Sequence, residues 1–184
     1  MSRTVVFAAI LSALAVGCHR TPSPDPAFAR ADRAATRFAT ELRGRLQAAM
    51  REGGPTRAVA VCGTEARALA ERVHSETGVR VGRASLRTRN PANVAPAWVG
   101  EWLHAQGERP AEGVVGVRAV AGSDVHVLRP IAVEAVCVTC HGDPAGMAPP
   151  LVAALRDAYP GDRATGYRPG DLRGALWVEA AITP

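Results

Sequence analysis

The chain has 184 residues, with 22 basic residues that are all arginine and 17 acidic residues, which leave a net charge of +5. The length suits one globular domain. The absence of lysine excludes Schiff-base chemistry and the lysine of a Walker A phosphate loop. The charge is modest for a nucleic-acid-binding protein of this length. Aromatic residues make up only 4% of the chain, so we expect another group to fill part of the core.

The N-terminus is typical of an export signal. Arg3 precedes the apolar stretch 5–16, which is too short to span a bilayer, since about 20 residues are needed, but suits a signal peptide. Ala15-Val16-Gly17 then precedes Cys18 and resembles a bacterial lipobox, although Ala15 stands where leucine is usual. We therefore predict a signal peptide over 1–17, a lipid on Cys18 and an exported, periplasmic, membrane-anchored protein. Ordinary signal cleavage is the alternative.

The remaining chain predicts a single α+β domain over 28–184, because helical periodicity comes first and β-branched runs follow. In chain order we predict a lipidated, Pro-rich tether over 18–27, a helix from Phe28 that ends at Gly53-Gly54-Pro55, a helix over 57–77, a strand over 79–86, a turn at 90–93, a helix over 96–106, a hairpin of 114–120 and 125–131, a helix over 149–158 and a closing strand over 175–182.

A C-x-x-C-H motif follows the predicted hairpin at Cys137, Cys140 and His141. This is the attachment signature of c-type haem, in which two thiols bind the vinyl groups of one porphyrin and the histidine binds the iron. A thioredoxin-like redox pair would require a βαβ setting, and a zinc site would require two further ligands at short spacing. The sequence therefore predicts one covalently attached haem c, with thioethers at both cysteines and His141 as the proximal ligand.

The spacing of residues alone does not identify the distal ligand, which would bind the iron on the side opposite His141. Cys62 is the one cysteine without another expected role, and it is also typical of a small buried hydrophobe. The competing candidates are methionines and histidines elsewhere in the chain, namely Met50, Met147, His74, His104 and His126.

Four stretches resemble a family of bacterial c-type haem domains with a PAS-like fold, found as small exported or lipid-anchored proteins and as sensor regions of histidine kinases. These stretches are 58–66, 83–93, 137–142 and 159–174, and they occur in the family's order. Two departures are Ala84, where threonine is common, and Ala66-Arg67, where Ala-Pro is usual. The resemblance implies a PAS-like antiparallel sheet flanked by N-terminal helices. It also implies that Cys62 is the distal ligand of the haem iron.

Arginines gather at Arg80, Arg83, Arg87 and Arg89. A nucleic-acid interface would interleave aromatic residues for stacking, and this stretch has none, so we expect no nucleic-acid partner. The default interpretation is a solvated strand edge. The alternative is that Arg83, Arg87 or Arg89 binds the haem propionates, to which guanidinium groups are well matched.

If protein ligands fill both axial positions, the iron has no open site for a substrate. The chain also lacks a nucleophile elbow, a H-E-x-x-H motif and a Gly-rich phosphate loop, so we predict no enzymatic activity. The sequence predicts a redox-active haem protein for electron transfer or redox buffering, with an unidentified redox partner. The alternative is a haem-based redox or gas sensor that signals to a separate membrane partner.

Overall fold

The computed structural model describes residues 22–183. The predicted signal peptide, the lipidation site at Cys18 and the first residues of the tether lie outside the described residues. The described part of the chain contains no helix that is both long enough and apolar enough to cross a membrane.

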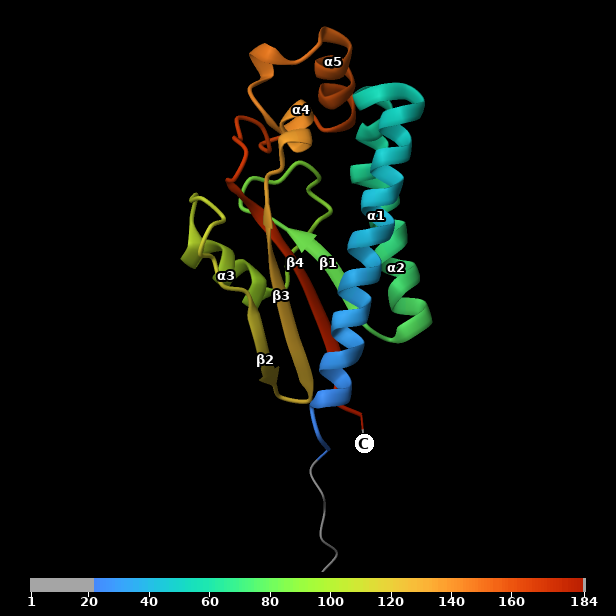
Figure 1. Cartoon of the computed structure of the whole chain (residues 1–184), viewed down its shortest axis with the longest axis vertical. Coiled ribbons are helices and arrows are strands. Elements are labelled where there is room, and N and C mark those ends of the chain that lie inside the picture. The colour runs from blue at the N-terminus through green and yellow to red at the C-terminus, as the bar shows by residue number, and fades with distance from the viewer. Residues whose placement is uncertain (1–21, 184) are drawn as a thin grey trace, which may run out of the picture.

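A four-stranded antiparallel sheet forms the centre of the fold, with the strand order β1-β4-β3-β2. Its strands are β1 (Arg80–Ala84), β2 (Val117–Ala121), β3 (Asp124–Ala132) and β4 (Leu172–Ala181). A long helix, α1 (Asp25–Ala60), lies along one face of the sheet, and a short helix, α3 (Ala97–Gln106), covers part of the other (Figure 1). The α+β prediction is confirmed.

Side chains on the central strands point alternately to the two faces of the sheet, and this produces one apolar layer under α1 and another under α3. On β4, Val178 and Ala180 pack against α1, while Ala175 and Trp177 pack toward α3. The α1 side of the core consists mainly of small residues and two rings from α1, Phe28 and Phe38. Few large side chains therefore fill the layer between α1 and the sheet.

Helix α1 starts at Asp25, earlier than the predicted domain start at Phe28, because Ala27 is already buried against the core. The predicted end at Gly53-Gly54-Pro55 is a kink, since Gly53 (φ −152°, ψ 18°) and Gly54 (φ 66°, ψ −166°) leave the helical conformation. Gly54 has a positive φ that glycine adopts without a steric cost. The helix then resumes, so the predicted boundary is a bend within one element.

The second predicted helix, over 57–77, is interrupted by a π-helical turn at Val61–Glu65. Beyond this turn, α2 (Ala66–Thr77) continues and ends at Gly78, whose φ of 68° closes the helix. A π turn holds one more residue than an α turn, and such turns occur frequently at functional sites. This turn contains Cys62.

One carboxylate fixes α1 to the sheet. Asp32 accepts hydrogen bonds from Arg118 of β2 (2.7 Å) and Arg129 of β3 (2.9 Å). Burial alone would raise the pKa of Asp32, but the hydrogen bonds and charges of these arginines outweigh it and hold the pKa below that of an ordinary aspartate. The pair of arginines thus anchors the N-terminal part of the helix to two strands.

The C-x-x-C-H motif lies at one end of the sheet. After β3, a 3-10 turn (Ala135–Cys137) leads into α4 (Val138–His141), followed by a second 3-10 turn (Pro144–Gly146) and α5 (Pro149–Ala158). In Figure 1, α4 and α5 form a cap at the end of the molecule opposite the C-terminus. The predicted hairpin, the turn at 90–93 and the helix at 149–158 are all present.

Candidate functional site

A cavity lies at the capped end of the sheet, where α1, the π turn, the loop after β1, the end of β3, α4 and the start of β4 meet. Both cysteines of the motif line it, together with His141 and Cys62. These residues come from segments far apart in sequence. The fold therefore gathers into one cavity the two cysteines predicted to attach the haem and the two residues predicted to bind its iron.

His141 is oriented by the loop that follows α5. Its Nδ1 lies 2.7 Å from the carbonyl oxygen of Ala164, and because a carbonyl only accepts, Nδ1 must carry the hydrogen. Burial lowers the pKa of His141 to about 3, and the charges of Arg173 and Arg89 contribute to this shift. The imidazole is therefore neutral at pH 7, with its lone pair on Nε2, which is the form that binds a metal.

Cys137, Cys140 and Cys62 are all free thiols. Burial raises the pKa of the Cys140 thiol, against the lowering effect of Arg89. The two motif cysteines follow an antiparallel strand and lie at the start of, and within, a four-residue helix. That setting is unlike the βαβ unit expected for a thioredoxin-like pair.

The structure shows which of the other candidate iron ligands, methionine or histidine, line the same cavity as Cys62. Met50 lines the cavity, whereas Met147 lies outside the cavity lining and packs with Leu151 and Tyr159 in an apolar cluster that borders the cavity at Cys140. His74 and His104 are exposed near the ends of α2 and α3 and lie outside the cavity lining. Met50 is thus the competitor of Cys62 that shares its cavity.

His126 has a structural setting on the far face of the sheet. Its ring stacks on Trp98, with centroids 4.3 Å apart and an interplanar angle of 14°. Its Nε2 lies 3.7 Å from Glu179, which also accepts a hydrogen bond from the Trp98 indole (2.7 Å). These contacts place His126 with α3 and away from the cavity.

Of the three arginines predicted near the cofactor, Arg83 and Arg89 line the cavity and Arg87 does not. Arg87 forms an ion pair with Glu108 (3.4 Å) and covers the Tyr167 ring, with its guanidinium carbon 4.1 Å from the ring centroid. Arg87 therefore contacts Glu108 and Tyr167 outside the cavity lining.

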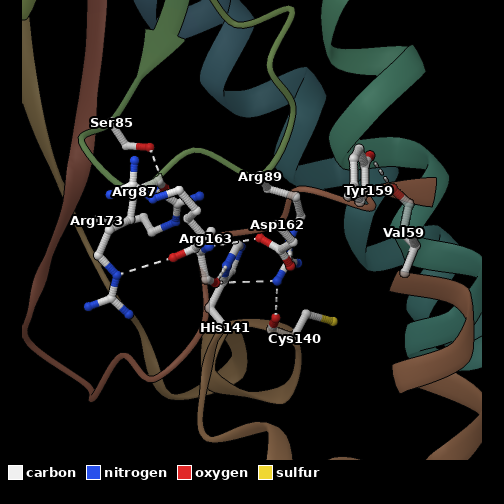
Figure 2. A network of polar contacts seen from close by, with 11 residues as sticks. Val59, Ser85, Arg87, Arg89, Cys140, His141, Tyr159, Asp162, Arg163 and Arg173 are labelled. Carbon is white, nitrogen blue, oxygen red and sulfur yellow. Dashed lines mark hydrogen bonds and ion pairs between the residues drawn. The ribbon is translucent and has the colours of Figure 1, made fainter. Parts of the chain in front are cut away.

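Arg89 bonds the loop 162–164, which orients His141, and the backbone of Cys140. It is 7% exposed, and its Nε donates to Asp162 (2.9 Å), which is 12% exposed. Its Nη2 donates to the carbonyl oxygens of Cys140 and Ala164. Figure 2 shows Arg89 between the carboxylate of Asp162 and the carbonyl of Cys140, with the His141 ring beside them. This network ties the loop that orients the imidazole to the backbone of Cys140, next to His141.

The sequence reasoning missed Arg173, which also lines the cavity. Burial lowers the pKa of Arg173, and Arg89 and Arg83 contribute through charge repulsion. Arg173 donates to the carbonyl of Arg87 (3.2 Å) and Arg83 to the carbonyl of Cys62 (3.2 Å). Within the described part of the chain, neither guanidinium pairs with a carboxylate. No local signal marks Arg173, since it is one arginine among 22 basic residues.

Comparisons with known proteins identify the family of this chain and one similar solved structure. The family model described as Tll0287-like matches residues 25–180. Among solved structures, the crystal structure of the cyanobacterial heme-protein Tll0287 matches with a TM-score of 0.65 and 26% identity, and the match covers 88% of this chain and 98% of that one. A search of curated proteins gives no match. Because the family model covers most of the chain, including the cavity and all but the last residue of the sheet, this protein is a member of the Tll0287-like family.

Proposed function

We propose that this protein binds one haem c covalently and acts as an exported redox protein. Cys137 and Cys140 would form thioethers, each by adding its S–H across one vinyl group of the porphyrin. Two observations support this attachment: both thiols line the same cavity, and the similar cyanobacterial structure is that of a heme-protein. The antiparallel setting of the motif also favours attachment over a thioredoxin-like pair.

The charges of the cavity fit the two propionates of a haem. Three guanidinium groups, those of Arg83, Arg89 and Arg173, reach its wall, and Asp162 neutralises only Arg89. Positive charge buried without a partner is costly, so an anionic ligand is expected to complete the site. Carboxylates match guanidinium groups in charge and in hydrogen-bond geometry. Arg83 and Arg173 are therefore the residues that we assign to the propionates.

One observation carries the proposed ligation: His141 and Cys62 line one cavity although they belong to α4 and to the π turn beyond α1. His141 would hold the iron through Nε2, while the carbonyl of Ala164 fixes the ring. Cys62 would supply the distal thiolate. The bound haem contributes a single-electron couple, and two protein ligands leave it no vacant position for a substrate. A role in electron transfer or redox buffering follows, without catalysis.

Export and anchoring belong to the same proposal. Haem attachment through C-x-x-C-H suits a protein translocated by the predicted signal peptide, and a lipid on Cys18 would retain it at the membrane in the periplasm. The redox partner is then another exported or membrane protein, with no role for nucleic acid.

The test is a redox titration of the matured holoprotein, with ferric optical and electron paramagnetic resonance spectra. A thiolate stabilises ferric over ferrous iron, so Cys62→Ala should raise the midpoint potential and change the ferric spectra. Met50→Leu is the matched control, because it removes the competing candidate for the distal sulfur ligand in the cavity lining and should leave the midpoint potential and the ferric spectra unchanged. Identical spectra for wild type and Cys62→Ala would exclude Cys62, and a change confined to Met50→Leu would assign that methionine.

The same experiment separates electron transfer from sensing. A reversible couple that is insensitive to carbon monoxide and nitric oxide would support electron transfer. Displacement of the distal ligand by either gas in the wild-type protein would instead favour a sensor.

A further inference from the structure

The π turn at Val61–Glu65 changes how the helix satisfies its carbonyl groups. The backbone N–H of Ala66 donates to Val61, five residues back, where an α-helix would use a spacing of four. A turn of this kind needs other groups to bond the carbonyls that it displaces. Two side chains from outside the helix bond carbonyls here, one at Val59 and one at Cys62.

Arg83 of β1 donates to the carbonyl of Cys62 itself (3.2 Å). Tyr159 donates its hydroxyl to the carbonyl of Val59 (3.2 Å), and this bond is buried (Figure 2). Val59 precedes the π turn and also lines the cavity. The tyrosine therefore holds the helix at the point where its geometry changes, just before Cys62.

Gly63 makes this approach possible. A Cβ added at Gly63 would lie 2.1 Å from the Tyr159 hydroxyl oxygen, far inside van der Waals contact. The backbone conformation of Gly63 does not itself require glycine, because no positive φ occurs there. The close approach of the tyrosine is thus the reason that this position accommodates only a hydrogen.

Tyr159 also belongs to the segment that orients His141. Its carbonyl accepts the N–H of Asp162 (3.0 Å), and Asp162 in turn accepts the N–H of Ala164 (2.7 Å). Ala164 is the residue whose carbonyl fixes the His141 ring (2.7 Å). A set of hydrogen bonds therefore links Val59, two residues before the π turn, through the segment 159–164 to the imidazole of His141.

We propose that Tyr159 is a positioning residue for the distal ligand: its hydroxyl holds the π turn in the geometry that presents Cys62 to the cavity. The inference rests on the proposed function and adds the residue that sets how firmly the thiolate is held. A purely structural role would be packing of the ring against Val59, Leu151 and Leu155, and phenylalanine would preserve that packing.

The test is competition by free imidazole for the ferric haem of the matured protein, followed optically. Tyr159→Phe should retain covalent haem and fold, but bind imidazole roughly tenfold more tightly than wild type, a change of about 1.4 kcal/mol. Its midpoint potential should move toward that of Cys62→Ala. Gly63→Ala displaces the same hydroxyl without removing it and should have the same effect, which covers the case in which Tyr159→Phe fails to fold.

Thr64→Val is the matched control, because it removes an exposed hydroxyl from the same turn and should behave as wild type. If Tyr159→Phe and Gly63→Ala both match wild type in imidazole affinity and potential, the positioning role is wrong. If wild type and Cys62→Ala share the same ferric spectra, the proposed ligation has failed instead. The two failures are therefore distinguishable.

Discussion

Arg89→Met should destabilise the protein strongly, because it removes the charge that neutralises Asp162. Arg89 and Asp162 are 7% and 12% exposed, and their Nε and Oδ2 atoms are 2.9 Å apart. Arg89 also serves the carbonyls of Cys140 and Ala164. Methionine keeps the apolar stem of the side chain, so the loss falls on the charge and its hydrogen bonds.

Breaking one partner of a buried ion pair costs about 3–5 kcal/mol, since the remaining charge is left without compensation. For a domain of this length each kcal/mol lowers Tm by about 2–4 °C, which gives a fall of about 6–20 °C. Asp162 keeps its bond from the Ala164 N–H (2.7 Å), which places the expected loss nearer the lower end.

The assay is urea unfolding of the holoprotein, followed by circular dichroism, in a double-mutant cycle with Asp162→Asn. We expect the double variant to be less destabilised than the sum of the single variants by more than about 1 kcal/mol. Additive losses within about 0.5 kcal/mol, or a loss below about 1 kcal/mol for Arg89→Met alone, would refute the assignment of a buried, coupled pair.

Three further predictions concern attachment, anchoring and pH. Cys137→Ala or Cys140→Ala should impair haem attachment and give an apoprotein with reduced thermal stability and weak near-ultraviolet dichroism, because the core has few rings of its own; unchanged values for both would contradict this. Cys18→Ser should move the protein from the membrane to the soluble exported fraction, and retention after a salt wash would count against the lipobox. Asp32→Asn should reduce the unfolding free energy by less than about 1 kcal/mol at pH 7, as for other partly exposed pairs. Because the folded-state pKa of Asp32 is depressed, this difference should be present above about pH 4 and vanish as pH falls through the folded-state pKa; a difference that does not shrink as the pH is lowered below about 4 would exclude the ion pairs.

Local signals in the sequence predict much of this fold. The hairpin around Gly122, the end of α2 at Gly78 and the start of α5 at Pro149 all depend on residues whose backbone preferences act within a few positions. The motif that ends at His141 is equally local, because its spacing alone implies its chemistry. Such features can be predicted from the sequence without knowledge of the tertiary contacts.

Features that depend on contacts between residues far apart in sequence could not be predicted from local patterns. The kink at Gly53 looked like a helix end because nothing nearby in sequence shows that the helix resumes and packs again. The π turn is stabilised by Tyr159 and Arg83, which lie far along the chain, so helical periodicity alone predicted a continuous helix. Arg173 enters the cavity only because β4 pairs between β1 and β3.

The length of α1 determines how far the cavity stands from anything attached at its first turn. The helix runs from the end of the sheet where the C-terminus leaves to the end that α4 and α5 cap (Figure 1). From Asp25 to Met50, which lines the cavity, an α-helix rises by about 38 Å. Fields from surface charges decay over about 8 Å at physiological ionic strength. A redox group in the cavity would therefore be insulated from the electrostatics of an attachment surface, and a partner anchored on that same surface would need a reach of comparable length to exchange electrons with it.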